Sequence, residues 1–238
     1  QIVSPAGRLI VEPTTLIGET GTVNVSSTQQ TVLLGRSYTN PVVIAQPPTQ
    51  NGGDTSVVRI TSVQPDRFTL YVHEAPNRDG AHTVESVNWI VVEAGRWQLS
   101  NGLMLQAGRQ SVGANVGPLL GSSWQGISYD APFAVAPAVL SQVQSASDAR
   151  WVKTRQRNVG ASAFDVALEQ HDAATSLHAA ETVGWIALQP GEGLWSGRPF
   201  VVGTTPAAVT DAWYTLGFGS NNLGALPIAM AAVTSYNN

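Results

Sequence analysis

A small set of polar residues occurs twice in this sequence, at a constant spacing of 96 positions. The matched pairs are Arg59 with Arg155, Glu74 with Gln170, His82 with His178, and Glu85 with Glu181. An arginine beside carboxylates can bracket sugar hydroxyls with charge-assisted hydrogen bonds. The same groups can instead form an internal polar network that closes one end of a domain, because an unpaired buried charge is costly. From the sequence, both interpretations are open.

The one position that changes within this set narrows the expected pairing. Gln170 keeps a hydrogen-bond acceptor but lacks the charge of Glu74, so an ion pair at that position is not essential in both copies. The repeated arginine is therefore predicted to pair with the carboxylate of Glu85 or Glu181.

The same residues make a poor catalytic or metal site. Glu74 and Glu85 would have to act as the acid and base of a glycosidase, but the second copy has Gln170 at the first of these positions. One histidine with one or two carboxylates is a weak ligand set, and residues 77–80 lack the spacing of a calcium loop. Thiolate chemistry is excluded because the chain has no cysteine. We predict a non-enzymatic protein with no metal and no cofactor.

The segments that carry these residues repeat with them. The stretch 41–95 matches 137–191 without a gap, and a third copy begins near Gly197. A period of this length indicates small domains rather than the shorter repeats of solenoids. The predicted domains are residues 1–96, 97–192 and 193–238. The third copy is expected to be a truncated domain or to need a partner, because so short a segment rarely buries an adequate core.

Each copy contains runs of β-branched and aromatic residues separated by turn residues, which is typical of strands. The strands expected are 57–63, 68–73, 84–92, 151–159, 164–170 and 182–188, with looser ones at 22–34, 113–127 and 210–216 and Pro-bounded ones at 41–46, 137–142 and 227–233. The side chains expected to face a core are Phe68, Leu70, Val72, Val87, Trp89 and Val91. The predicted fold class is all-β, with tandem six-stranded antiparallel β-sandwiches and a partial third repeat.

This arrangement resembles the H-type lectin domain, and in particular its bacterial tandem-repeat branch. The resemblance is carried by the Pro-aliphatic strand 41–46, by the spacing of Arg59, Val63 and Phe68, and by the closing strand that contains Trp89. It covers most of both full copies. It implies six-stranded antiparallel sandwiches that bind sugars and commonly assemble as trimers.

The resemblance also implies positions for a ligand. The arginine that contacts sugar in animal members corresponds to Arg59 and Arg155. A Trp-His pair of the family is replaced by Ala75-Pro76 in the first copy and by His171-Asp172 in the second. The predicted ligand-binding residues are Arg59, Glu74, His82, Glu85, Arg155, Gln170, His171, Asp172, His178 and Glu181.

The composition excludes other classes of partner. Charged residues make up only 12% of the chain and the net charge is −4, which argues against nucleic-acid binding. An apolar run of about 18 residues, as membrane insertion by a helix requires, does not occur.

Two functions are compatible with these observations. The first is a non-catalytic carbohydrate-binding or adhesin-like tandem module of a larger extracellular protein, with a glycan or cell-surface polysaccharide as partner. The alternative is a structural stalk or filament subunit, in which strands from a neighbouring chain complete the partial third copy. In either case we expect a homo-oligomer, either a trimer or a polymer, that is secreted, displayed at the cell surface or part of a virion fibre.

Overall fold

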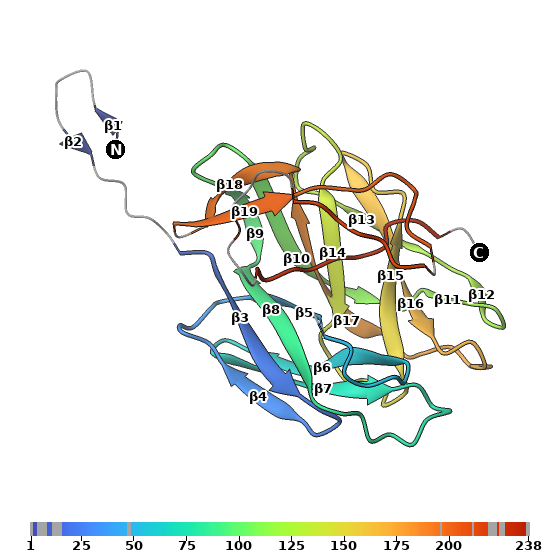
Figure 1. Ribbon diagram of the computed structural model, residues 1–238. Helices are drawn as coiled ribbons and strands as arrows, with labels where there is room; N and C mark the ends of the chain where they lie inside the picture. Colours follow the sequence, from blue (N-terminus) through green and yellow to red (C-terminus); the bar gives the residue numbers. More distant parts are fainter. Residues whose placement is uncertain are drawn as a thin grey trace.

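The computed structural model of the chain is built from β-strands (Figure 1). It describes residues 2–3, 9–10, 16–46, 49–195, 197–210, 212–218, 223 and 227–236. These residues contain no helix, and hence none that is long and apolar enough to cross a membrane. The predicted all-β class is confirmed. Near the N-terminus, β1 (Ile2–Val3) pairs with β2 (Leu9–Ile10).

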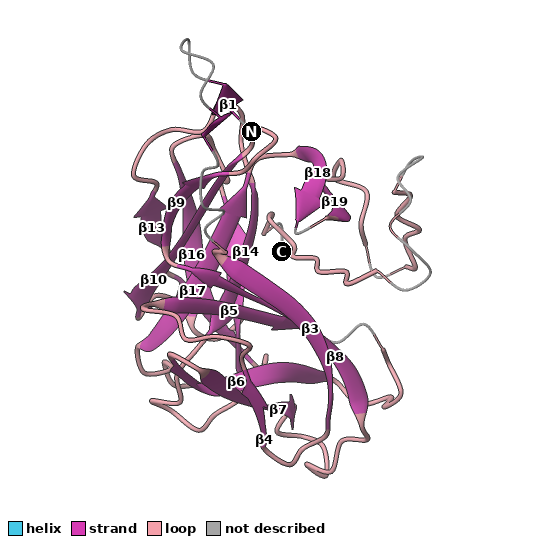
Figure 2. Ribbon diagram, turned by 90° about the vertical axis from the view of Figure 1, so that its left-hand side faces the viewer, coloured by secondary structure: helices cyan, strands magenta, loops and turns pink. Residues whose placement is uncertain are grey.

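The first sandwich consists of two three-stranded antiparallel sheets (Figure 2). One has the order β3 (Gly18–Val25), β8 (Glu85–Glu93), β5 (Pro41–Gln46), and the other β4 (Gln30–Leu33), β7 (Arg67–Glu74), β6 (Ser56–Gln64). The six alternating side chains of β7 and β8 that were expected to face the core are all buried in one cluster between these sheets. The predicted six-stranded sandwich is therefore correct for this part of the chain.

The second sandwich is larger. One sheet has the order β14 (Ala138–Val143), β17 (Glu181–Leu188), β10 (Met104–Val112), β9 (Gly95–Gln98). The other sheet has the order β12 (Gly121–Ser122), β11 (Asn115–Gly117), β16 (Ala163–Gln170), β13 (Gln125–Ser128). Strand β15 (Val152–Arg157) also pairs with β16. The bounds of β7 and β16 differ by 96 positions at both ends. Strand β9 spans the predicted boundary at residue 96 and pairs with β10 of this sandwich.

One strand pair in the second sandwich is parallel, whereas the sequence predicted antiparallel sheets. In the first sandwich the segment after β3 is bridged to β7 by one backbone hydrogen bond, which the Val72 amide donates to the Ser26 carbonyl at 2.8 Å. The second sandwich has the equivalent bond from the Leu168 amide to the Ala114 carbonyl, also 2.8 Å long. Here the chain continues alongside β16 as the short strand β11, so the bridge extends into a parallel pair.

A tryptophan and a glycine face each other across neighbouring strands in both sandwiches. Trp89 lies opposite Gly21, and Trp185 lies opposite Gly108. A Cβ atom at Gly21 would approach Cζ2 of Trp89 to 2.3 Å, and one at Gly108 would approach Cζ2 of Trp185 to 2.6 Å. Glycine is needed at these positions because the indole occupies the space of a side chain.

The two sandwiches pack against each other through a further hydrophobic cluster. Its buried members come from β5, β8, β10 and β17 and are Val42, Ile44, Val92, Leu105, Ala107 and Ile186. Two glutamine amides of the second sandwich donate to carbonyls of the first, Gln142 to Val58 at 2.7 Å and Gln144 to Val43 at 2.6 Å. The sheets thus meet over a packed apolar surface with polar contacts at its edge.

The third segment begins with a hairpin of β18 (Gly191–Trp195) and β19 (Arg198–Val202). Figure 1 shows the orange and red segment running along the second sandwich. The strands expected at 210–216 and 227–233 are not formed, although residue 211 lies outside the described residues. Their sequences favour strands, but backbone hydrogen bonds of a sheet require a neighbouring strand and the described residues here have none.

Candidate functional site

The carboxylate of Glu85, at the start of β8, is enclosed by the loop that follows β5. It accepts hydrogen bonds from Thr49 Oγ1 at 2.6 Å, from the Asn51 amide at 2.8 Å and from the Gly52 amide at 2.8 Å. Burial opposes the charged carboxylate, but these bonds outweigh it and lower the pKa of Glu85 to about 2. Glu85 is therefore a buried anion at neutral pH.

The carboxylate of Glu181, at the start of β17, has the same surroundings 96 positions later. Ser145 Oγ donates to it, as do the amides of Ser147 at 3.0 Å and Asp148 at 3.2 Å. Burial again opposes ionisation, and the bonds from Ser145, Ser147 and an arginine outweigh it, so the pKa of Glu181 is lowered. Each sandwich thus holds a buried glutamate anion that is enclosed by an equivalent loop.

The carboxylate of Glu85 lies beside a histidine of its own sandwich. His82 Nε2 lies 3.2 Å from Glu85 Oε1, and His82 Nδ1 lies 2.9 Å from Glu74 Oε1. The second oxygen of Glu74 accepts the Gly80 amide at 2.9 Å. Because both ring nitrogens face carboxylate oxygens, the imidazole bridges two acidic groups inside the sandwich.

The anion of the second sandwich is balanced from outside, by Arg59 of the first. Arg59 Nη2 lies 2.7 Å from Glu181 Oε1, and the two side chains are 2% and 0% exposed. The same nitrogen donates to the Asp148 carbonyl at 3.1 Å. His178 does not take this place: its Nδ1 lies 3.9 Å from Glu181 and 2.9 Å from the Ala179 carbonyl.

The two networks differ at one matched position, which holds Glu74 in the first copy and Gln170 in the second. In the first sandwich the Glu74 carboxylate faces His82 Nδ1, so the imidazole lies between two carboxylates. Gln170 has no charge to offer, and its amide donates to the Ser176 carbonyl at 2.8 Å. An arginine from the neighbouring sandwich supplies the positive charge that Glu181 then needs.

These contacts correct the predicted pairing within each copy. Arg59 was expected to pair with the glutamate of its own copy, but it pairs with Glu181 of the other. Arg155 also does not contact Glu181; its Nε lies 2.9 Å from Glu169 Oε2, which Lys153 Nζ contacts at 2.9 Å as well. The sequence placed each arginine at the end of its own sandwich, whereas the outer face of β6 is covered by the second sandwich.

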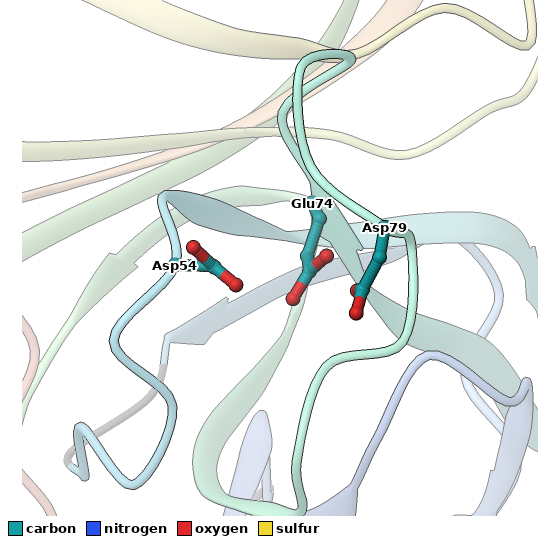
Figure 3. A group of neighbouring side chains, drawn as sticks. All are labelled: Asp54, Glu74 and Asp79. Atoms are coloured by element: carbon teal, nitrogen blue, oxygen red, sulfur yellow. The ribbon is translucent and has the colours of Figure 1, made fainter.

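Three carboxylates gather beside the first network, on Asp54, Glu74 and Asp79 (Figure 3). Their nearest oxygen atoms lie within 4.8 Å of one another. Each has a partner: Arg78 Nη1 from the loop after β7 lies 3.0 Å from Asp54, and backbone amides donate to Glu74 and Asp79. Oxygen ligands of this kind suit a hard cation, yet the partners already present neutralise or bond to each group.

A polar cleft of about 210 Å³ lies between the two sandwiches. Its lining residues are Thr55, Ala75 and Asn77 from the first sandwich, and Trp151, Lys153, Glu169, Gln170, His171 and Asp172 from the second. The structure therefore brings three predicted ligand residues, Gln170, His171 and Asp172, into one cleft. The cleft is separate from Arg59, Glu85 and Glu181. These three side chains are buried, and a ligand could reach them only if the structure opened.

Sequence reasoning missed the other polar groups of this cleft. Lys153 and Glu169 are adjacent across β15 and β16, and the Lys153 ammonium lies 5.5 Å from the Trp151 ring centre. Lys153 is the one lysine of the chain, and this was the feature of the sequence that distinguished it. The contribution of Asn77 could not be anticipated, because it comes from the other sandwich.

Comparison with known proteins finds a relative. No protein-family model matches the chain, and no solved structure matches it. The chain is similar to halomucin of Haloquadratum walsbyi, with 31% identity over 232 residues. The match covers 91% of this chain but 2% of halomucin, so the chain corresponds to a very small part of that protein.

Proposed function

We propose that the chain is a non-catalytic structural module of a large extracellular surface protein. The similarity to halomucin supports this role, because that protein carries the name of a mucin and is far longer than this chain. The observation that carries the proposal is the ion pair between Arg59 and Glu181, which ties one sandwich to the next. Such a module would hold its sandwiches in a fixed relation along a surface protein.

The energetics of the ion pair favour a fixed joint. Removing one partner of a buried pair leaves an uncompensated charge, at a cost of about 3–5 kcal/mol. The charge on Glu181 is therefore tolerated only while the first sandwich stays in place. A buried pair of this kind fixes orientation more than it adds net stability.

Calorimetry tests this proposal on the full chain. We expect both sandwiches to unfold in a single transition whose calorimetric and van't Hoff enthalpies agree. Two separate transitions, each with the enthalpy of one sandwich, would show that the joint does not couple them and would overturn the proposed structural role.

A second candidate function is weak carbohydrate binding in the cleft between the sandwiches. It is favoured by the position of Gln170, His171 and Asp172, which were predicted from the sequence as ligand-binding residues and which line this cleft. With Lys153 and Asn77 they offer donors and acceptors for hydroxyl groups. Weak sites of this kind gain avidity when a module is repeated along a chain.

Glycan-array binding followed by titration calorimetry tests the second candidate. Asp172→Asn keeps the shape of the cleft but removes its exposed negative charge, so bound glycan should be lost. Asp130→Asn, an exposed change outside the cleft lining, is the matched control. Binding of no glycan, or equal loss in both variants, would exclude a carbohydrate site at this place.

A further inference from the structure

The third segment of the chain contacts the first sandwich through positions that have equivalents in both complete copies. The Pro-aliphatic stretches that begin at Pro41, Pro137 and Pro227 align without a gap over their first five residues. On that alignment Ala45 corresponds to Ala231, and Gln142 corresponds to Gln46. These equivalences make contacts between different copies directly comparable.

One backbone contact occurs twice in this comparison. The Ala45 amide of the first copy donates to Gln142 Oε1 of the second at 3.4 Å. The Ala231 amide of the third copy donates to Gln46 Oε1 of the first at 2.8 Å. The third copy therefore contacts the first as the first contacts the second.

A second contact repeats in the same direction. The Val43 carbonyl accepts the Gln144 amide, which occupies the space beside Gly184: a Cβ there would lie 2.4 Å from Gln144 Nε2. Asn88 is the equivalent of Gly184, and its own amide donates to the Ala229 carbonyl of the third copy at 3.4 Å. Ala229 is the equivalent of Val43. A side-chain amide thus fills the same place in both interfaces.

Part of the remaining interface, between the second and third copies, is also present. In the first interface the Arg59 guanidinium reaches the Asp148 carbonyl. Its equivalent, the Arg155 guanidinium, lies 5.5 Å from the ring centre of Tyr236, two positions before the equivalent of Asp148. Tyr236 also meets the Trp124 ring, with ring centres 5.2 Å apart.

The same three-way relation holds on the apolar side. Ile44, Leu140 and Met230 occupy equivalent positions of the three stretches, and all three belong to the hydrophobic cluster between the copies. A row of copies would bring the third against the second only. Contacts that run from the third to the first, from the first to the second and from the second to the third describe a closed ring.

We propose that three β-sandwich units close into a ring within one polypeptide, around an axis lined by these stretches. The surface beside Arg155, here called the open sector, is the docking surface for a third sandwich. That sandwich is continuous with residues 227–236 and carries a buried carboxylate for Arg155. Exposed apolar side chains of the third segment, such as Trp213 at 96% exposure, are then core residues of that unit. The proposal goes beyond the structural role above, because it names the partner of a surface that the joint between the first two sandwiches leaves open.

Cross-linking of the full chain tests the ring, and the absence of cysteine makes introduced pairs specific. Gln46→Cys with Ala231→Cys, and Trp124→Cys with Tyr236→Cys, should each react with a short bismaleimide within one chain. Leu33→Cys with Ala231→Cys, on the exposed outer strand β4, is the control and should not. Near-ultraviolet circular dichroism verifies that each variant is folded, and the two pairs probe different interfaces.

Peptide mapping of the monomer fraction gives the answer. Intrachain links in both test pairs are the expected result. Links only between chains would show an open assembly built by strand exchange, and no links in folded variants would show that the third segment does not occupy the sector; either result overturns the ring. Such a failure leaves the pairing of Arg59 with Glu181 unaffected, so it is distinguishable from failure of the proposed structural role.

A lengthened chain tests the vacant docking surface itself. Residues 149–192, which carry Glu181 and its strand, are repeated after Asn238 to complete the third unit. Arg155→Met should lower the denaturation midpoint of this longer chain and leave that of the original chain almost unchanged. An equal effect in both chains, or no effect in either, would contradict the docking surface.

Discussion

Arg59 Nη2 and Glu181 Oε1 lie 2.7 Å apart although the residues are separated by 122 positions in sequence. The pair joins two sandwiches that each have their own core. The equivalent glutamate of the first sandwich has His82 of its own sandwich as neighbour. The same buried carboxylate thus contacts a histidine within one sandwich and an arginine of the other sandwich in the second.

Removal of the guanidinium from Arg59 should strongly destabilise the protein. Arg59→Met retains the apolar stem but leaves Glu181 charged and unpaired, so the free energy of unfolding should fall by about 3–5 kcal/mol. Arg155→Met is the matched control, because the Arg155 side chain is 22% exposed and Glu169 keeps its contact with Lys153, so the cost should be less than about 1 kcal/mol. Urea unfolding of both variants measures the difference, and equal costs would contradict the assignment.

Replacement of Glu74 by glutamine, the residue at the matched position of the second sandwich, should also destabilise the protein. Glu74→Gln removes the second carboxylate from His82, and among the described residues no arginine from another sandwich reaches Glu85. We expect a loss of about 1.5–3 kcal/mol, the range for a hydrogen bond to a charged group. Thermal unfolding measures it. An unchanged or raised melting temperature would show that Glu74 does not hold the histidine in place.

Acid should weaken the fold through its buried carboxylates. The pKa of Glu85 is lowered from 4.5 to about 2 in the folded protein, and those of Glu181 and Asp148 are also lowered. The unfolded chain therefore takes up protons first. Stability from Glu85 is complete above about pH 4.5 and is lost as the pH falls toward 2, in total on the order of 3 kcal/mol.

The control for this pH dependence is Glu85→Gln. The variant is less stable at neutral pH, but its free energy of unfolding should fall less steeply between pH 4.5 and 2. Chemical denaturation at several pH values gives both slopes. Parallel slopes in the two proteins would mean that Glu85 is not the group that titrates.

The glycines opposite the core tryptophans should not accept a side chain. Gly21→Ala and Gly108→Ala each force a methyl group against an indole that is already packed in a core, and we expect a cost of about 1–3 kcal/mol for each. Gly53→Ala is the control, because no atom lies within 4 Å of its added Cβ. Melting temperatures that fall equally for all three variants would contradict this explanation.

Much of the fold could be predicted from the sequence because alternation in β7 and β8 is clear. Phe68 and Trp89 lie in the predicted core, and the strands that contain them begin and end within a few residues of the predicted bounds. Strand β10 was missed, since the prediction placed a looser strand at 113–127, whereas β10 ends at Val112. Small residues such as Ala107 and Gly108 weaken its pattern.

The polar networks could be predicted only in part. The recurrence of Glu85 and Glu181 correctly indicated two equivalent positions at the ends of core-facing rows. The partner of Glu181 could not be found by pairing residues inside one copy, because it comes from the outer face of β6. The change from Glu74 to Gln170 was the available signal, since it marks the matched position at which the two polar networks differ.

A double-mutant cycle on Arg59 and Glu181 tests the central claim most directly. Urea unfolding of Arg59→Met, Glu181→Gln and the double variant gives the coupling free energy between the two side chains. We expect a coupling of about 2 kcal/mol or more, with the double variant more stable than the sum of the single losses allows. Additive losses, with no coupling, would show that the two residues do not pair and would contradict the joint between the sandwiches.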